Sequence, residues 1–427
     1  MQKPPFHSSQ APPRVGARSL ALGDDRLPVV KLRSAGPHPL IYRKRIAHVD
    51  RSARAGDIVE VQNSEGGRVG YGLYNPKAEL ALRMLSRGDE LPDEAWWQRK
   101  LEDAVCLRRD ILKLEDSTDS YRVVHAEGDG LSGLVIDKLG NVLSAQCFAL
   151  GMHQRSEAIV TKLAALLGTK HWLISTSPAS LAQEGFEGPD LKSPEMPGRE
   201  TIQEFGTRFR IDFAEGHKTG FFCDQRDNRR RLASFCADKT VLDLCCYTGG
   251  FAIQAKKLGG AGEVIGIDLD EGPLALAREN ANLNQVRVKF VQADAFAYMR
   301  DMLRTGRKFD VVVLDPPKLI RTRDELEEGT RKHFDLNRIA MRLVAPGGMM
   351  LSCTCAGLLS HEDFLRMIYA SARQAGDEIS AATEDRYARH ASRHVQILAE
   401  TGAAPDHPIA ANCPETGYLQ AVWMRVM

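Results

Sequence analysis

The 427-residue chain lacks an apolar run long enough to cross a bilayer, and its N-terminus lacks the apolar stretch of a secretory signal. It also lacks a disulfide pattern, because its nine cysteines are odd in number and scattered. These absences exclude a membrane-spanning protein and a small disulfide-stabilised one. We therefore expect a cytoplasmic protein with reduced thiols and no membrane partner.

The chain also lacks an overall excess of charge of either sign, since its formal net charge is +1. The excess is local: residues 29–88 hold eleven Lys and Arg against five Asp and Glu. Such a stretch is compatible with nucleic-acid binding, but taken alone a solvated surface explains it better.

The length predicts more than one domain. Residues 1–28 are proline-rich and poor in large apolar residues, which is typical of a disordered tail, with a transit peptide as the alternative. Short strands over residues 29–88 predict a small β-barrel, and helical spacing predicts a helical linker over residues 89–120. A hairpin, a helix and two further strands predict a small central α/β domain over residues 121–213.

Residues 214–427 change to alternating strands and helices. The expected strands are the apolar segments 241–244, 264–267, 288–291, 311–314 and 349–353. This alternation predicts an α/β fold with a parallel, doubly wound sheet of the Rossmann-like type. Since ligands of such sheets bind at the carboxyl ends of the strands, polar residues directly after these strands are the candidate site residues.

The first expected strand contains Asp243 and ends in a turn with Tyr247, Gly249 and Gly250, which opens a helix. Glycine lets a ligand approach the backbone, and the N–H groups at a helix start favour an anion. The GxGxxG spacing that suits a pyrophosphate is absent, which weakens the case for a nicotinamide-dependent dehydrogenase. The carboxylate of S-adenosylmethionine does not need this glycine spacing, so Asp243, Tyr247 and Gly249 are predicted to bind this cofactor.

Single acids follow the next two expected strands. Asp268 lies nineteen residues after Gly249, where an acid can accept both ribose hydroxyls. A helix N-cap before Asp270 is the alternative for Asp268. Asp294 can reach the adenine edge or can serve as an N-cap, and we give these two interpretations equal weight.

The fourth expected strand ends in Asp315-Pro316-Pro317-Lys318, the most specific motif in the chain. The prolines stiffen the turn and present carbonyl groups to the cleft. Such a turn can hold the polar edge of a base against the methyl donor. Asp315 is therefore a candidate for cofactor binding and catalysis, and Pro316, Pro317 and Lys318 are candidates for substrate binding.

Cys353 and Cys355 end a later strand and face the same cleft. A thiolate that attacks C6 of cytosine makes C5 nucleophilic enough to accept a methyl group, provided that the site lowers the pKa of the thiol. Two alternatives are small core residues and a metal site with Cys245 and Cys246. Because adjacent or one-apart cysteines fit zinc poorly, we predict no metal.

Together these motifs resemble those of the RlmI-type methyltransferases, class I enzymes that form 5-methylcytosine in bacterial large-subunit rRNA. The resemblance covers roughly residues 29–427. It is carried by segments 38–42, 217–220, 224–226, 246–251, 315–318, 414–419 and 425–427.

The resemblance implies a PUA RNA-binding domain at residues 29–88, with the catalytic Rossmann-like domain at the C-terminal end. It identifies Cys355 as the nucleophile, because Cys353 stands where the family commonly has an apolar residue. Gln225 and Arg226 fall in a segment that could cap the cofactor. The implied partner is large-subunit rRNA, and the implied oligomer is a homodimer, since relatives are often dimers.

Two further interpretations stay open. Asp-Pro-Pro turns also serve N-methyltransferases, including relatives that make 7-methylguanine, and a nitrogen nucleophile needs no thiol. A non-catalytic RNA-binding ribosome-assembly factor could keep the fold and lose the cofactor. The intact Asp243, Gly249, Asp268 and Asp315 argue against that loss.

Overall fold

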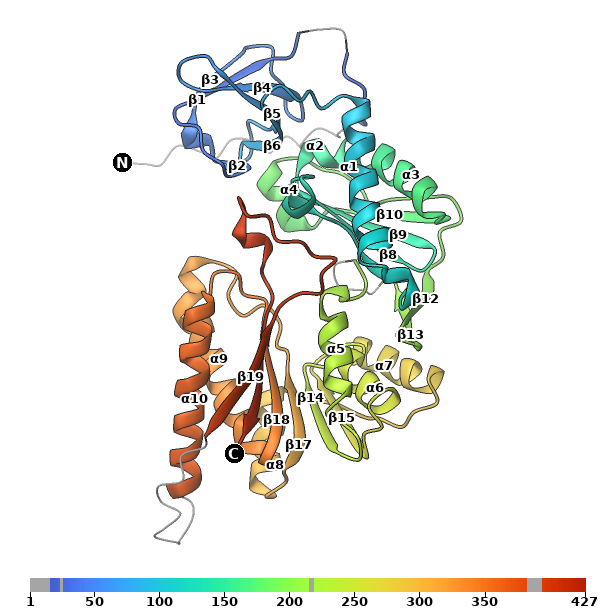
Figure 1. The fold of residues 1–427 in the computed structure, drawn as a ribbon, viewed down its shortest axis with the longest axis vertical. Coiled ribbons are helices and arrows are strands. Elements are labelled where there is room, and N and C mark those ends of the chain that lie inside the picture. The colour runs from blue at the N-terminus through green and yellow to red at the C-terminus, as the bar shows by residue number, and fades with distance from the viewer. Residues whose placement is uncertain (1–15, 24–25, 215–218, 382–393) are drawn as a thin grey trace, which may run out of the picture. The chain divides into compact units, whose positions relative to one another are not determined.

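The computed structural model describes residues 16–23, 26–214, 219–381 and 394–427 (Figure 1). The chain divides into two compact units. The first comprises Met1–Leu112, Arg122–Pro197 and Pro408–Thr416, and the second comprises Lys113–Tyr121, Gly198–His407 and Gly417–Met427. Among the helices in the described ranges, none has both the length and the apolar character needed to cross a membrane.

A six-stranded sheet begins the first unit, in the order β2-β6-β5-β4-β1-β3. Its strands are β1 (Val29–Leu32), β2 (Leu40–Ile41), β3 (Ile46–Val49), β4 (Ile58–Gln62), β5 (Arg68–Tyr74) and β6 (Leu82–Arg87). Val30, Val59, Val61 and Leu82 from three of them are fully buried in a shared core. All six strands lie within residues 29–88, where the sequence predicts short strands.

A helix and a second sheet complete most of the first unit. Helix α1 (Glu94–Cys106) begins at the N-cap Asp93, whose side chain accepts a hydrogen bond from the Trp96 amide. A π-helical turn, η2 (Leu107–Ile111), follows it. The sheet has the order β11-β10-β9-β8-β7. Its strands and helices are β7 (Ser120–His125), β8 (Leu134–Leu139), β9 (Val142–Cys147), α2 (Leu150–His153), α3 (Ser156–Leu167), β10 (His171–Ser175), α4 (Pro178–Glu184) and β11 (Leu191–Lys192).

The hairpin of β12 (Arg199–Glu204) and β13 (Thr207–Asp212) belongs to the second unit. The backbone amides of Arg208 and Arg210 donate to the side-chain oxygens of Asn284 and Asn280, at 2.9 and 2.7 Å. These bonds attach the hairpin to helix α7 (Glu271–Leu283) and to the residue after it. This division differs from the predicted border at residue 213, because these hydrogen bonds join the hairpin to the C-terminal part of the chain.

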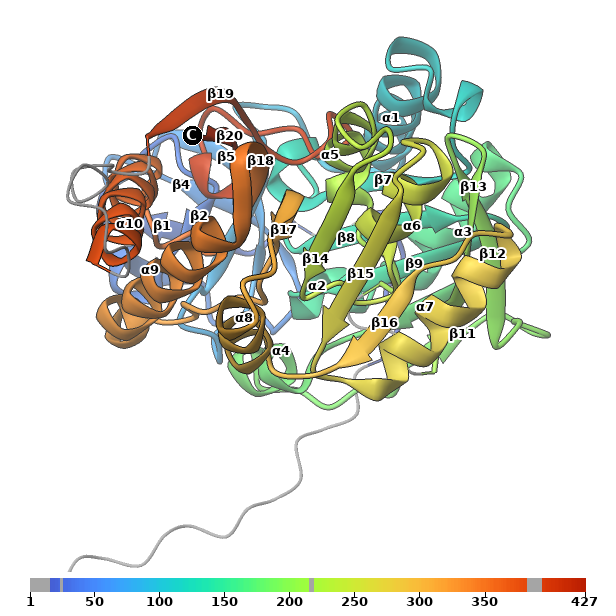
Figure 2. The ribbon, with the colours of Figure 1, turned by 90° about the horizontal axis from the view of Figure 1, so that it is seen from below.

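The second unit is built on a seven-stranded sheet in the order β16-β15-β14-β17-β18-β20-β19 (Figure 2). Its strands are β14 (Thr240–Leu244), β15 (Glu263–Asp268), β16 (Lys289–Gln292), β17 (Phe309–Leu314), β18 (Val344–Thr354), β19 (Val395–Thr401) and β20 (Gln420–Val426). The first five are parallel, and β20 runs antiparallel to both of its neighbours. The expected parallel, doubly wound sheet is therefore confirmed.

Helices cover both faces of this sheet. They are α5 (Arg226–Ala233), α6 (Gly250–Lys257), α7 (Glu271–Leu283), α8 (Ala295–Arg304), α9 (Leu326–Leu343) and α10 (His361–Ala381). Leu242 and Leu244 of β14 pack with α8, α9 and α10, whereas Val241 packs with α5 and α6. This alternation along one strand buries both faces, which is why the strands read as continuous apolar runs.

Strand order reverses at β14: the chain adds β15 and β16 on one side, then β17 and β18 on the other. In open α/β sheets the ligand-binding crevice opens at such a reversal, at the carboxyl ends of the strands. The antiparallel β20 between β18 and β19 departs from the all-parallel dinucleotide-binding arrangement.

Segment Pro408–Thr416 returns to the first unit after the chain has built most of the second. The ring Nε2 of His38 lies 3.4 Å from the Glu415 carboxylate, and Asn412 donates to the Pro37 carbonyl at 3.2 Å. The potential ligand atoms of His38, Cys413 and Glu415 lie within 4.8 Å of one another, and the expectation of no metal stays a prediction.

Candidate active site

The turn between β14 and α6 has an unusual backbone. Cys245, Tyr247 and Gly249 have φ values of +64°, +50° and +82°. Left-handed backbone costs free energy for residues other than glycine, so the surroundings must hold it. A Cβ on Gly249 would meet Phe290 and Ile253 at 3.0 Å, which leaves room only for glycine. The turn directs the first N–H groups of α6 to the carboxyl edge, where they can bind an anion.

Asp243 is 1% exposed and has an incomplete set of hydrogen bonds. Its Oδ2 accepts a hydrogen bond from the Ala252 amide at 3.0 Å, whereas its Oδ1 has no hydrogen-bond partner among the described residues. Burial raises the pKa of Asp243 well above its usual range, the Ala252 hydrogen bond lowers it in part, and the charges of Asp315 and Asp268 raise it further. An unpaired buried acceptor is costly. It fits the ammonium group of a bound S-adenosylmethionine.

Asp268 is fixed as a hydrogen-bond acceptor at the end of β15. Its two oxygens accept from the amides of Tyr247 and Asp270, at 2.8 and 3.1 Å. The N-cap of α7 is Asp270, whose side chain accepts from the Gly272 amide, so the N-cap interpretation of Asp268 is wrong. A carboxylate has about four acceptor sites, so Asp268 keeps capacity for the hydroxyls of a ribose.

Leu269 is a site candidate that the sequence analysis missed. Its side chain is 68% exposed although it directly follows Asp268. An exposed apolar residue beside an acid that is predicted to bind ribose offers a surface for an adenine ring. The signal was present in the sequence, as a leucine between two acids at the end of an apolar strand.

Asp294 is the N-cap of α8, and its side chain accepts from the Ala297 amide at 2.9 Å. The N-cap interpretation is therefore confirmed. Contact between Asp294 and an adenine ring stays a prediction.

Asp315 lies directly after β17, and Gln225 reaches it from the segment before α5. The side-chain amide of Gln225 donates from Nε2 to Asp315 Oδ2 at 3.0 Å, and its Oε1 accepts from the side chain of Asn228 at 2.7 Å. Of the three residues that follow, Pro316 is buried, whereas Pro317 and Lys318 are exposed. The structure thus brings Gln225 and Asp315 together at the point where the strand order reverses.

Arg226 requires a correction. Its guanidinium is 1% exposed and makes two hydrogen bonds of 3.0 Å with the Asp406 carboxylate. Against the effect of burial, His407 and Arg226 hold the pKa of Asp406 well below its usual range. A guanidinium held in this way is neutralised inside the protein, and a contribution of Arg226 to cofactor binding stays a prediction. The matching segment 217–218 lies outside the described residues.

The two cysteines of β18 and its end differ in their surroundings. Cys353 is fully buried among apolar residues, and burial raises the pKa of its thiol well above the usual range, as does the charge of Asp315. Cys355 lies just past the strand and is half-buried. Thr354 between them points to the opposite face, where its hydroxyl lies 3.1 Å from the ring of the buried His333. Cys355 is thus the more accessible thiol.

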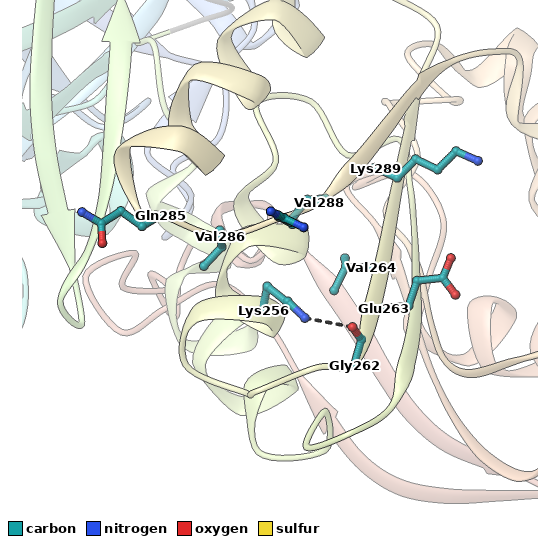
Figure 3. A pocket seen from close by; sticks show the side chains of 9 residues that line it. Lys256, Gly262, Glu263, Val264, Gln285, Val286, Val288 and Lys289 are labelled. Atoms are coloured by element: carbon teal, nitrogen blue, oxygen red, sulfur yellow. Dashed lines mark hydrogen bonds between the residues drawn. The ribbon is translucent and has the colours of Figure 1, made fainter.

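A cavity of about 660 Å³ lies at the start of β15 and β16, lined by Lys256, Gly262 and Glu263 among others (Figure 3). This is the amino edge of the sheet, whereas ligands of such sheets bind at the carboxyl edge. A smaller cavity of about 90 Å³ adjoins Tyr247 and Thr248. The candidate site therefore consists of the residues at the carboxyl ends of the strands.

Comparison with known proteins identifies the family. Residues 123–378 match the model of the S-adenosylmethionine-dependent methyltransferases, and residues 33–87 match a PUA-like domain. The chain belongs to the S-adenosylmethionine-dependent methyltransferases. S-adenosylmethionine is accordingly its cofactor, and the predicted fold, with a PUA-like domain before the catalytic one, is confirmed.

Similar proteins extend over nearly the whole length of this methyltransferase. Ribosomal RNA large subunit methyltransferase I of Klebsiella pneumoniae (strain 342) is 33% identical over 397 residues, which cover 91% of this chain and 94% of that protein. The protein of the same name from Escherichia coli (strain K12) is 32% identical, with coverages of 91% and 96%. The RlmI-type resemblance is therefore confirmed.

Solved structures agree on the fold. A SAM-dependent methyltransferase from Streptococcus mutans superposes with a TM-score of 0.74 at 18% identity, covering 93% of this chain and 100% of that one. A second methyltransferase structure, solved with S-adenosylhomocysteine (SAH), has the same TM-score and identity and covers 93% and 99% of the two chains.

The acids Asp268 and Asp270 provide a matched pair for testing ribose binding. Asp268→Ala should weaken SAH binding by roughly tenfold to a hundredfold, because two hydrogen bonds of about 1 kcal/mol each are lost. Asp270→Ala should cost about 1 kcal/mol of stability through the lost N-cap, with the affinity for SAH retained. Calorimetric titration and thermal unfolding measure both. Equal losses of affinity would contradict the assignment of Asp268.

The unpaired Asp243 oxygen predicts a pH dependence of cofactor binding. Its pKa is raised in the free protein and should fall when an ammonium group binds beside it. Binding then releases a proton, so the affinity for SAH should weaken as the pH falls. Titrations at several pH values test this. Asp243→Asn should bind more weakly and lose most of the pH dependence, and an unchanged profile would argue against the contact.

Proposed function

We propose that this methyltransferase forms 5-methylcytosine in large-subunit rRNA through a covalent adduct of Cys355. The observation that carries the proposal is the place of this thiol. Cys355 follows β18 at the same edge where Asp315 follows β17, and these two strands are paired in parallel. A nucleophile and an acid at one edge can engage one pyrimidine from two sides. The names of the relatives from Klebsiella and Escherichia coli support rRNA as the substrate.

The PUA-like domain supports RNA as the partner. In the 3₁₀ turn Arg43–Arg45, Arg43 and Lys44 are exposed and Arg45 is half-buried, and Tyr42 directly before the turn is 53% exposed. Cations of this kind contact phosphates, and an exposed aromatic ring can stack on an unpaired base. These contacts would hold the RNA, while the target cytosine is turned out of its stack into the catalytic crevice.

The proposed reaction begins with the addition of a thiolate to the cytosine ring. The Cys355 thiolate forms a bond to C6 while Asp315 gives a proton to N3, and the resulting enamine carries electron density at C5. S-adenosylmethionine supplies the methyl group as an electrophile on its sulfonium. C5 would form the bond to that methyl group while the sulfur–methyl bond breaks and S-adenosylhomocysteine leaves, and C5 would then lose its proton to water. The C6–sulfur bond breaks, N3 returns its proton to Asp315, and the thiolate is restored.

Nucleoside mass spectrometry tests the product. Total rRNA from a strain without this protein is incubated with the purified enzyme and methyl-labelled S-adenosylmethionine, then digested. We expect the label in 5-methylcytosine. Label in 7-methylguanine or another base would overturn the cytosine proposal and would leave both cysteines as core residues. No label in any nucleoside, with SAH still bound, would favour an assembly factor.

Substitution of the two thiols tests the nucleophile. Cys355→Ala should abolish methylation and leave SAH binding unchanged, whereas Cys353→Ala should retain methylation, because its buried thiol is not the attacking group. RNA with 5-fluorocytosine at the target should form a denaturation-resistant adduct with the wild type and not with Cys355→Ala, since the C5 fluorine cannot leave as a proton does. Full activity of Cys355→Ala would exclude the assignment.

A further inference from the structure

Glu204 is the last residue of β12, and its carboxylate is completely buried. Both oxygens accept from Arg229 of α5, at 2.8 and 2.6 Å, and Gln254 of α6 donates to the same carboxylate at 3.0 Å. A buried ion pair costs much desolvation free energy and is weak evidence for a stabilising purpose. Its surroundings therefore need to be followed further.

Arg229 connects this pair to the cofactor-binding turn. Its third contact is a hydrogen bond of 3.0 Å to the Phe222 carbonyl. The Phe222 ring packs edge-on against Tyr247, with 5.1 Å between the ring centroids. A Cβ on Gly250 would lie 3.1 Å from Cδ of Arg229, so the arginine stem packs against the first residue of α6. One arginine side chain thus contacts both the Phe222 segment and the first residue of α6.

The charge of Arg229 also reaches Asp243, since it lowers the pKa of that buried carboxyl. Asp243 carries the oxygen that we assign to the cofactor ammonium. The Arg229 charge and a bound ammonium group would therefore both act on the Asp243 carboxylate, unless a second acid offsets the charge of the arginine. Glu204 is that acid.

We propose that Glu204 is a positioning residue for cofactor binding. By holding Arg229 with both oxygens, it fixes Phe222 and the turn at Tyr247 and partly offsets the arginine charge that acts on Asp243. The inference rests on the cofactor site alone and not on which RNA atom is methylated. Its failure is therefore distinguishable from failure of the cytosine proposal.

The test compares Glu204→Gln with Glu200→Gln in the full-length protein. Glu200 is a glutamate of the same strand whose carboxylate accepts from the Thr201 amide at 3.1 Å, so it is a matched control. Glu204→Gln should weaken SAH binding on the order of tenfold and raise KM for S-adenosylmethionine equally, with kcat little changed, because a displaced site loses binding. Glu200→Gln should resemble the wild type.

A purely stabilising role would not move the pH profile. In Glu204→Gln the released Arg229 charge keeps Asp243 ionised, so the dependence of SAH affinity on pH should flatten relative to the wild type. Arg229→Lys serves if Glu204→Gln does not fold, because it keeps the charge and loses the fork that holds Phe222; it should also weaken SAH binding. A lower unfolding temperature with unchanged SAH affinity, KM and pH profile would overturn the proposal.

Discussion

The site depends on a constraint of parallel sheets: neighbouring strands deliver their carboxyl ends to one edge, and a reversal of strand order separates the loops that follow them. Here the reversal falls between β14 and β17. The turn after β14, Asp268 at the end of β15 and Asp315 after β17 therefore meet at one crevice, although they are far apart in sequence. A cofactor with a charged end and a ribose can be bound by the first two of these loops, while the third is left for the base.

Buried charge surrounds this crevice and is almost entirely neutralised within the protein. Helix α5 contributes two arginines, and each is paired with an acid from a distant segment: Arg226 with Asp406 and Arg229 with Glu204. Asp243 differs, because one of its oxygens is left without a partner in the described residues. A protein interior tolerates such an acceptor when a ligand completes it. The contrast between paired and unpaired acids thus separates residues that shape the site from Asp243, which is predicted to bind the cofactor there.

Local signals in the sequence predicted the parts of the fold that depend on local chemistry. The five parallel strands were found because both faces of the sheet are covered, which makes each strand a short apolar run. Strand β19 escaped, because its residues alternate between half-buried and exposed. The candidate acids were found because they lie at the carboxyl ends of strands or just past them.

Pairings between distant segments could not be predicted from a single sequence. Nothing in the residues around Arg226 shows that its partner lies 180 positions later, so its buried ion pair was not predicted. The hairpin β12–β13 was placed with the central domain for the same reason, since the amide groups that bind it are on α7. Asp294 could be read in two ways because an N-cap and a ligand contact require the same short acid at a strand end.

The return of segment Pro408–Thr416 to the first unit has a consequence for biosynthesis. A nascent chain leaves the ribosome N-terminus first, and domains generally fold as units during synthesis. The barrel strands of the first unit emerge early, but the partners of His38 and Pro37, Glu415 and Asn412, belong to one of the last segments made. This unit therefore cannot reach its final contacts until residue 416 has been translated, long after its core could have formed.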